Sequence, residues 1–232
     1  MCLMPPNRLD ELGEATTLLE VRARLRSHRW APELDIFERS PGVVRRFDAG
    51  LDVPEGLETG NGPYVVLVEG PLRTTGHLHL WTDDYLPGLV VVRGDLEART
   101  LSFGNGARVF VEGSVRVEGE LFGQYGDRNA ALVATGVIQA RATFLETTAG
   151  MYAEGGVQSL VYSPLGLYES LVPDIENEGV GDGVHSFDPS VLDAYGDLDF
   201  RKAIQAAREG RPLFLPGIEE RFPLRLTLRA TR

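Results

Sequence analysis

One short apolar pattern recurs five times around a glycine between residues 65 and 157. The five segments read VVLVEGPL (65–72), LVVVRGDL (89–96), RVFVEGSV (108–115), ALVATGVI (131–138) and MYAEGGV (151–157). Their anchoring glycines are Gly70, Gly94, Gly113, Gly136 and Gly155, separated by 24, 19, 23 and 19 residues. An apolar residue stands two and four positions before each glycine and two positions after it. Because alternate residues of a strand share one face, each segment predicts a strand with one apolar face.

A repeat of this length, built from short strands and glycine corners, is typical of a β-solenoid, in which stacked coils share one continuous core. The glycine marks a corner where the backbone needs a positive φ or a close approach. We therefore predict a mainly β protein, a short β-solenoid whose coils are about 19–24 residues long. An antiparallel β-sandwich, whose strands also recur at short intervals, stays open as the alternative.

The segments on either side do not repeat, and they predict helices. Residues 8–29 show apolar residues at helical spacings. The predicted stripe consists of Leu9, Leu12, Leu19 and Ala23, widened by Leu18 and Leu25. A second helix is expected over residues 198–209, with Asp197 or Asp199 as its cap and Gly210 at its end.

Asp188-Pro189 is a further helix start, and residues 223–231 alternate leucine with polar residues, as a strand would. Because a solenoid needs covered ends, we expect these flanking segments to act as caps. The chain then divides into 1–63, an N-terminal helix and capping segment, 64–162, the repeats, and 163–232. This last region holds an acidic loop, capping helices and a terminal strand.

Glycine-anchored coils between non-repetitive ends resemble the bactofilins, the polymer-forming cytoskeletal proteins of bacteria. The segments that carry the resemblance are LVVVRGDLEARTLSFG (89–104) and RVFVEGSVRVEGELFG (108–123), and it covers roughly residues 64–160. The resemblance implies a β-solenoid that assembles with copies of itself. This sequence differs in its alternating coil length and its long ends. The pattern is also similar to small solenoid proteins of bacterial toxin neighbourhoods, which implies a role in toxin neutralisation.

The chain is acidic, with 23 Lys and Arg against 34 Asp and Glu and a formal net charge of −11. That balance disfavours a nucleic-acid partner. The single cysteine, Cys2, allows neither an intrachain disulfide nor a cysteine zinc cluster. The first residues lack the pattern of a secretory signal, and no stretch approaches the ~18 apolar residues of a membrane span. We expect a cytoplasmic protein without a membrane partner.

His77 and His79 stand two residues apart on a predicted strand, so both rings lie on one face, and Asp83 follows. Two imidazoles and a carboxylate suit zinc or iron(II). The alternation with Leu78 and Leu80 equally fits a polar, solvent-facing strand side. We keep the three residues as candidate metal ligands and assign no metal and no cofactor.

Residues 173–200 carry eight acids and neither lysine nor arginine. Some of these acids stand at helix starts, where carboxylates act as caps. The remainder concentrate a negative field, which steers a basic partner and speeds encounter. The residues assigned to this partner contact are Asp174, Glu176, Glu178, Asp182 and Asp193.

The sequence contains no G-x-S-x-G elbow, no phosphate-binding P-loop and no H-E-x-x-H motif, and we assign no catalytic residue. The first hypothesis is a non-catalytic cytoplasmic protein-binding module, most concretely an immunity-type inhibitor that masks a bacterial toxin through its acidic surface. One alternative is a self-assembling, bactofilin-like scaffold. The other is a solenoid enzyme that acts on carbohydrate.

Reversing the charge at Asp174, Glu176 and Glu178 is expected to weaken the binding of a basic protein partner. The salt dependence of the affinity should also flatten, because fewer screened charge pairs remain across the interface. Calorimetric titration at two salt concentrations measures both quantities. An unchanged affinity and an unchanged salt slope would contradict the assignment.

Overall fold

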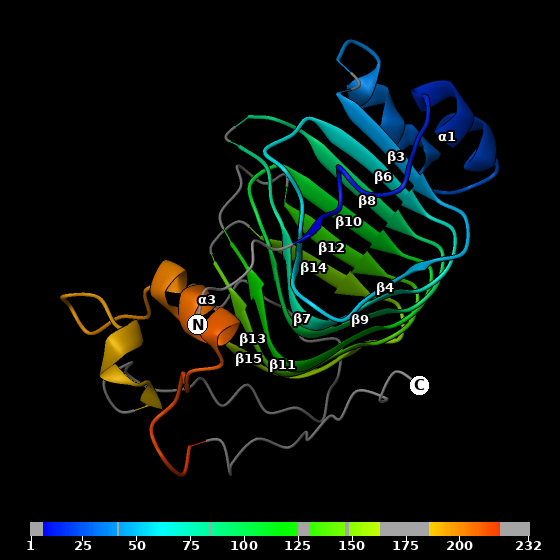
Figure 1. The fold of residues 1–232 in the computed structure, drawn as a ribbon. Helices are drawn as coiled ribbons and strands as arrows, with labels where there is room; N and C mark the ends of the chain where they lie inside the picture. Colours follow the sequence, from blue (N-terminus) through cyan, green and yellow to red (C-terminus); the bar gives the residue numbers. More distant parts are fainter. Residues whose placement is uncertain are drawn as a thin grey trace.

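The strands of successive repeats stack in parallel in the computed structural model of the chain (Figure 1). The structure describes residues 7–40, 42–83, 85–124, 130–146, 149–162 and 186–218. Each coil adds one short strand to one sheet, called sheet B, and one longer strand to a second, called sheet A. The predicted β-solenoid, with about five turns, is confirmed. Coil-to-coil pairing is parallel in both sheets, which excludes the antiparallel sandwich.

Sheet B runs through β14 (Gly150–Ala153), β12 (Ala131–Ala134), β10 (Ala107–Val111), β8 (Gly88–Val92), β6 (Tyr64–Val68), β3 (Val43–Phe47) and β2 (Glu14–Ala15). Sheet A runs through β1 (Asn7–Arg8), β5 (Leu57–Glu58), β7 (Leu72–Leu80), β9 (Leu96–Phe103), β11 (Val115–Gly123), β13 (Ile138–Leu145) and β15 (Val157–Tyr162), with β4 (Leu51–Val53) beside β7. The long strands shift register midway, so β4 pairs with the first half of β7 and β5 with the second half.

The coil formed by β3, β4 and β5 precedes Tyr64, in the part of the chain that the sequence placed with the N-terminal cap. It pairs in parallel with β6 and β7 like the later coils. Phe47 pairs with Val68 and Leu51 pairs with Leu72, so Ala49 stands where the next coil has Gly70, and Gly50 follows one position later. Because the glycine is displaced by one position, a search anchored on the corner glycine misses this coil.

The corner glycines stack on one another along the solenoid. A Cβ atom on Gly94 would lie 2.8 Å from the Gly70 carbonyl carbon, and one on Gly113 would lie 2.8 Å from the Gly94 carbonyl carbon. The Gly136 N–H donates to the Gly113 carbonyl, and the Gly155 N–H donates to the Gly136 carbonyl. The column is therefore glycine because each coil's backbone passes too close to the next for any side chain.

Sheet B is apolar on both faces, which the alternating pattern alone does not require. Val66 and Val68 point into the solenoid, as predicted, while Val65 and Leu67 pack in a separate cluster on the outer face. The N-terminal helices cover that outer cluster. They are α1 (Leu18–Arg24) and the 3₁₀ helix η1 (Ala31–Phe37). A strand buried on both faces is a continuous apolar run.

The N-terminal helix is shorter than the helix predicted over residues 8–29. Thr17 and Glu20 form a capping box that starts α1 at Leu18. The prediction is wrong upstream of this point, because Leu9 enters the solenoid core and Gly13 has a φ of +75°. Of the predicted stripe, Leu25 is buried and Leu18 packs against the same cluster, as expected. The prediction is wrong for Leu19, which is 76% exposed, and it omits Val21, which is buried.

The predicted C-terminal helix is confirmed as α3 (Phe200–Glu209), with Asp199 as its cap and Gly210 in the left-handed conformation at its end. Asp188 accepts a hydrogen bond from the Ser190 N–H, but the helix that it starts is only the short 3₁₀ helix η2 (Pro189–Val191). The strand predicted over 223–231 lies outside the described residues. No helix among the described residues is long and apolar enough to cross a membrane.

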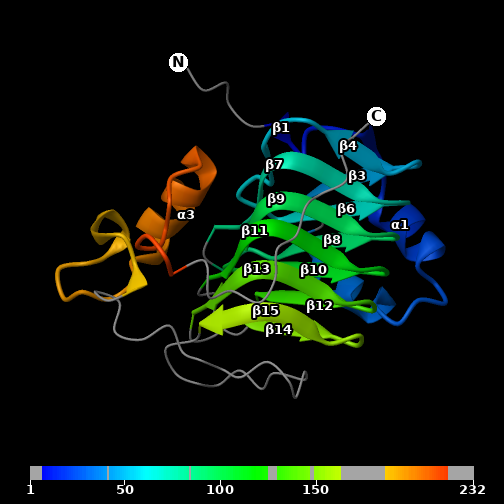
Figure 2. The same ribbon diagram turned by 90° about the horizontal axis from the view of Figure 1, so that it is seen from below.

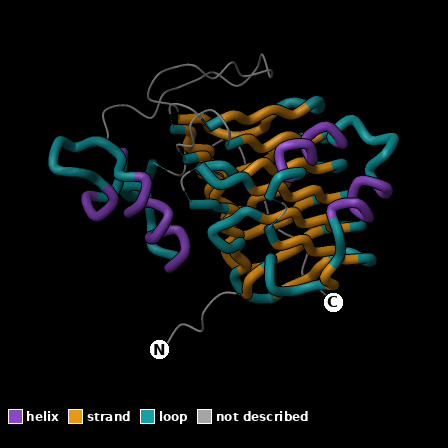
Figure 3. The backbone as a smooth tube through the Cα atoms, turned by 90° about the horizontal axis from the view of Figure 1, so that it is seen from above, coloured by secondary structure: helices purple, strands orange, loops and turns teal. Residues whose placement is uncertain are grey.

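The helices lie on two opposite sides of the stack (Figures 2 and 3). α1 and η1 cover sheet B, whereas α3 and η2 pack on the outer face of sheet A around Phe122 and Phe144. The N-terminal end of the stack is covered by residues 7–15, since β1 pairs with β5 and β2 pairs antiparallel with β3. The flanking helices therefore pack along the stack, and the extended residues before α1 cover this end.

Replacing Gly113 with alanine should lower the free energy of unfolding by roughly 1–3 kcal/mol, because the new Cβ overpacks against the preceding coil. Urea denaturation measures the change. Gly150→Ala is the matched control, since its Cβ would meet no atom closer than 3.5 Å, at the Ala130 carbonyl oxygen. Equal effects from the two substitutions would contradict a steric role for the column.

Candidate functional site

A wide cleft of about 1260 Å³ separates the outer face of sheet A from the C-terminal segment. The wall on sheet A carries His79, Trp81 and Gln124, and the opposite wall carries Asp193 and residues of α3. The C-terminal segment is anchored over sheet A by an aromatic cluster in which Phe144 contacts Phe187 and Phe214. The cleft is thus a product of two segments far apart in the sequence.

Arginines tie α3 to the solenoid beside this cleft. The Arg99 guanidinium of β9 donates to the Arg208 carbonyl oxygen at 3.1 Å, in the last turn of the helix. A guanidinium is well placed there, because the final carbonyls of a helix have no partner within the helix. Arg208 in turn pairs with Glu58 of β5 at 3.3 Å. These contacts hold one wall of the cleft against the other.

The two candidate histidines lie on the outer face of sheet A, and both are committed to hydroxyl groups. The His77 Nδ1 lies 2.7 Å from the Thr100 hydroxyl oxygen, and its Nε2 lies 2.8 Å from the Ser102 hydroxyl oxygen. The same Ser102 oxygen lies 2.6 Å from the His79 Nδ1. In neutral rings, the serine hydroxyl donates to one imidazole and accepts from the other.

Burial keeps both rings neutral near pH 7. His77 is 6% exposed, and burial, with smaller effects from His79, Arg208 and Arg99, holds its pKa well below 6.5. Burial, followed by the charge of Arg208, lowers the pKa of His79 to about 4. Both histidines therefore lie on a polar strand face, as predicted, but His77 is buried and does not face solvent.

The metal hypothesis gains no support from this arrangement. The structure brings His79 and Asp83 to the same cleft, whereas both nitrogens of His77 already contact hydroxyls. In the ranges that the structure describes, no group of three or more His, Cys, Asp and Glu side chains is placed to hold a metal ion.

Of the acids assigned to a protein partner, the structure describes Asp193 alone. Asp174, Glu176, Glu178 and Asp182 lie outside the described residues. The Asp193 carboxylate accepts hydrogen bonds from the backbone N–H groups of Asp197 and Tyr195, which lower its pKa. Asp193 therefore stays charged and braces a tight loop whose tip is Tyr195.

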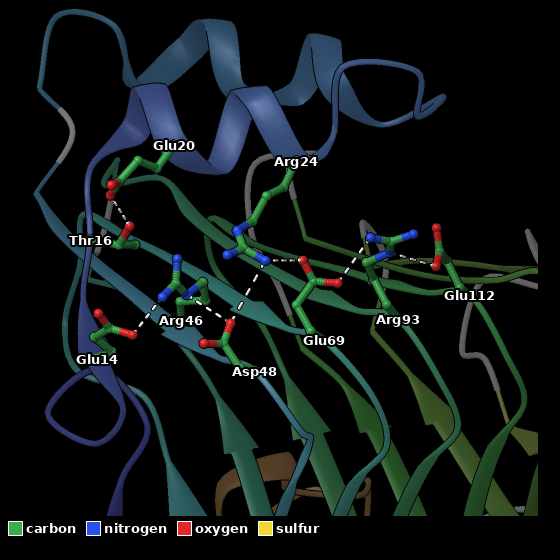
Figure 4. Close-up of polar contacts among 9 residues, drawn as sticks. All are labelled: Glu14, Thr16, Glu20, Arg24, Arg46, Asp48, Glu69, Arg93 and Glu112. Carbon is green, nitrogen blue, oxygen red and sulfur yellow. Dashed lines mark hydrogen bonds and ion pairs between the residues drawn. The ribbon is translucent and has the colours of Figure 1, made fainter.

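A second cluster of charges lies at the corner where the sheet B strands end (Figure 4). Arg93 bridges Glu69 at 2.9 Å and Glu112 at 3.1 Å, one coil to either side. Arg24 of α1 joins the row through Glu69 at 3.2 Å and Asp48 at 3.7 Å. These side chains pair with one another across coils, so their role is to link the coils and to fix α1 against the corner.

Among the cleft residues to which sequence reasoning gave no binding role are Trp81, Asn105 and Gln124. Trp81 continues the row of His77 and His79, and its ring stacks on that of His79 with 5.5 Å between centroids. The two-residue spacing of these aromatic side chains was the signal that could have found it, since it places all three on one strand face.

The chain shows no significant match to a protein-family model, to a curated protein or to a solved structure.

The His79→Gln substitution should remove part of the acid sensitivity of the fold. In the folded protein the pKa of His79 is about 4, whereas in the unfolded chain it is near 6.5. Its contribution to stability is therefore full above pH 6.5 and is lost as the pH falls toward 4, on the order of 3 kcal/mol. Urea denaturation of both proteins between pH 4 and pH 7.5 gives the difference. The carboxylates titrate in both proteins, so their effects cancel in the difference between the two free energies of unfolding. A difference that does not change with pH would refute the low pKa of His79.

Proposed function

We propose that the protein is a non-catalytic cytoplasmic module that binds a basic protein partner, in the manner of an immunity-type inhibitor of a bacterial toxin. The observation that carries the proposal is the braced loop from Asp193 to Asp197. Tyr195 at its tip is 91% exposed, and the Asp193 carboxylate holds the backbone N–H groups of Tyr195 and Asp197.

This loop has the properties of a binding hot spot. A tyrosine offers a large contact area at a low cost in side-chain entropy, and tyrosine is enriched among the residues that dominate interface energies. The aspartates on either side, Asp193 and Asp197, favour a partner with basic side chains. Because the loop is held by its own hydrogen bonds, little ordering remains to be done upon binding.

The groups of the cleft that could act in catalysis are poorly placed to do so. Ser102, the hydroxyl group between the two imidazoles, is fully buried and cannot meet a substrate without rearrangement. With a pKa of about 4, His79 is poorly matched to proton transfer near pH 7.

The bactofilin-like alternative, assembly of copies through the ends of the solenoid, is less favoured. Residues 7–15 cover the first coil, with β1 paired to β5 and Leu9 in the core. A copy docking on that end would have to displace this segment.

The Tyr195→Ala substitution should weaken binding to the protein partner at least tenfold, as expected for a hot-spot aromatic. The immobilised chain first captures the partner from the source cells, and the purified partner is then titrated calorimetrically at two salt concentrations. Asp197→Lys should both weaken binding and flatten the salt dependence. Tyr85→Ala is the matched control, because Tyr85 is 90% exposed on a different loop. A partner that binds all these variants alike, or that carries no basic surface, refutes the proposal.

A further inference from the structure

The Gln124 side chain makes no hydrogen bond to the described residues. Gln124 comes directly after β11, is 8% exposed and lines the cleft. Its backbone N–H donates to the Phe103 carbonyl at 2.8 Å, so its position is fixed by the coil stack. Its amide is not among the buried side-chain groups that lack a partner, so it meets solvent in the cleft. The amide is placed to hold something that enters the cleft.

Trp81 gives the same cleft a fixed aromatic wall. Its ring stacks on His79 with an interplanar angle of 12°. On the next coil it lies across the backbone of Gly104, where a Cβ atom would collide with the ring. Glycine at 104 therefore makes room for the indole, and the stack on His79 limits its rotation. The half-buried ring then presents apolar surface to the cleft.

Two more polar groups lie beside this wall. Asn105 donates through its side-chain nitrogen to the Thr82 carbonyl at 2.7 Å, which orients the amide and leaves its oxygen to accept. Asn105 also has a φ of +51°, a backbone conformation that non-glycine residues adopt uncommonly. The Asp83 carboxylate is exposed at the same wall. The wall thus combines one flat apolar surface with donors and acceptors at its edges.

The charges of the cleft select against a phosphorylated ligand. Apart from Glu146, its charged lining consists of the three carboxylates of Asp83, Asp193 and Asp199 and the two guanidinium groups of Arg201 and Arg208. Arg208 is already paired with Glu58. A surplus of carboxylates repels phosphate and tolerates a neutral ligand.

The geometry points to a saccharide-binding site in this cleft, for a neutral oligosaccharide that stacks on Trp81 and hydrogen-bonds to Gln124, Asn105 and Asp83. A pyranose ring has an apolar C–H face and a rim of hydroxyl groups that both donate and accept. Aromatic rings match the first feature, and amides and carboxylates match the second. A volume of about 1260 Å³ exceeds that of a typical small-ligand pocket, which suits several sugar units.

This inference does not rest on the proposed protein contact. Tyr195 is not among the residues that line the cleft, so Tyr195→Ala should leave saccharide binding unchanged. Failure of one proposal is therefore distinguishable from failure of the other.

The test is isothermal titration calorimetry of the full chain with cellohexaose, maltohexaose, xylohexaose and chitohexaose, and with adenosine and guanosine. We expect saturable binding of at least one hexasaccharide. Gln124→Leu should weaken that binding at least tenfold. It should leave the melting temperature about unchanged, because the Gln124 amide makes no hydrogen bond to the described residues that the substitution could remove. Trp81→Ala should reduce the affinity further.

Gln139→Leu is the matched control. Gln139 lies on the same sheet, and its side chain donates to Gln158 at 2.6 Å, away from the lining of the cleft. This variant should keep the wild-type affinity within about twofold. The inference is overturned if none of the four hexasaccharides binds, or if one binds equally well to Gln124→Leu and Trp81→Ala. It is also overturned if a nucleoside binds in their place with the same dependence on Gln124.

Discussion

The close approach of one coil to the next at the glycine corner is the constraint on which the rest of the structure depends. Gly70, Gly94 and Gly113 lie directly over one another, and a Cβ on either of the latter two would stand 2.8 Å from the backbone before it. Parallel pairing needs adjacent strands within about 5 Å of each other along their whole length. A corner that held the coils further apart would break both ladders at once, and the row of Glu69, Arg93 and Glu112 could no longer pair between coils.

The stack buries its own interior but leaves both sheets with outward faces, and the two ends of the chain cover parts of these. α1 and η1 complete the outer face of sheet B, where Leu67 and Val91 are fully buried. On sheet A the cover is less close. Phe122 and Phe144 pack against the C-terminal segment, while the neighbouring row of polar and aromatic side chains opens into the cleft. The candidate sites result from this arrangement, since the cleft exists only where the cover stands away from the sheet.

Some polar groups beside the cleft hydrogen-bond to one another, and others do not. His77, Ser102 and Thr100 satisfy one another, so they stabilise the wall. The Gln124 side chain makes no hydrogen bond within the described residues, and its amide lines the cleft. The acids of the 193–197 loop differ again, because the backbone that Asp193 braces presents Tyr195 outward.

The coil, its corner glycines and the inward positions could be predicted from the sequence, because they depend on local periodicity. The cap of α3 could be narrowed to Asp197 or Asp199, because it depends on short-range hydrogen bonds. The sequence also placed both histidine rings on one strand face. It did not determine that α1 begins only after Thr17, that Leu9 joins the core or that Asp48 belongs to a further coil. It did not reveal that His77 is buried or that Gln124 lines a cleft with Trp81. These features depend on which distant segment packs against which sheet face. The residue pattern of a single strand does not show which segment will cover it, so they follow from the tertiary structure alone.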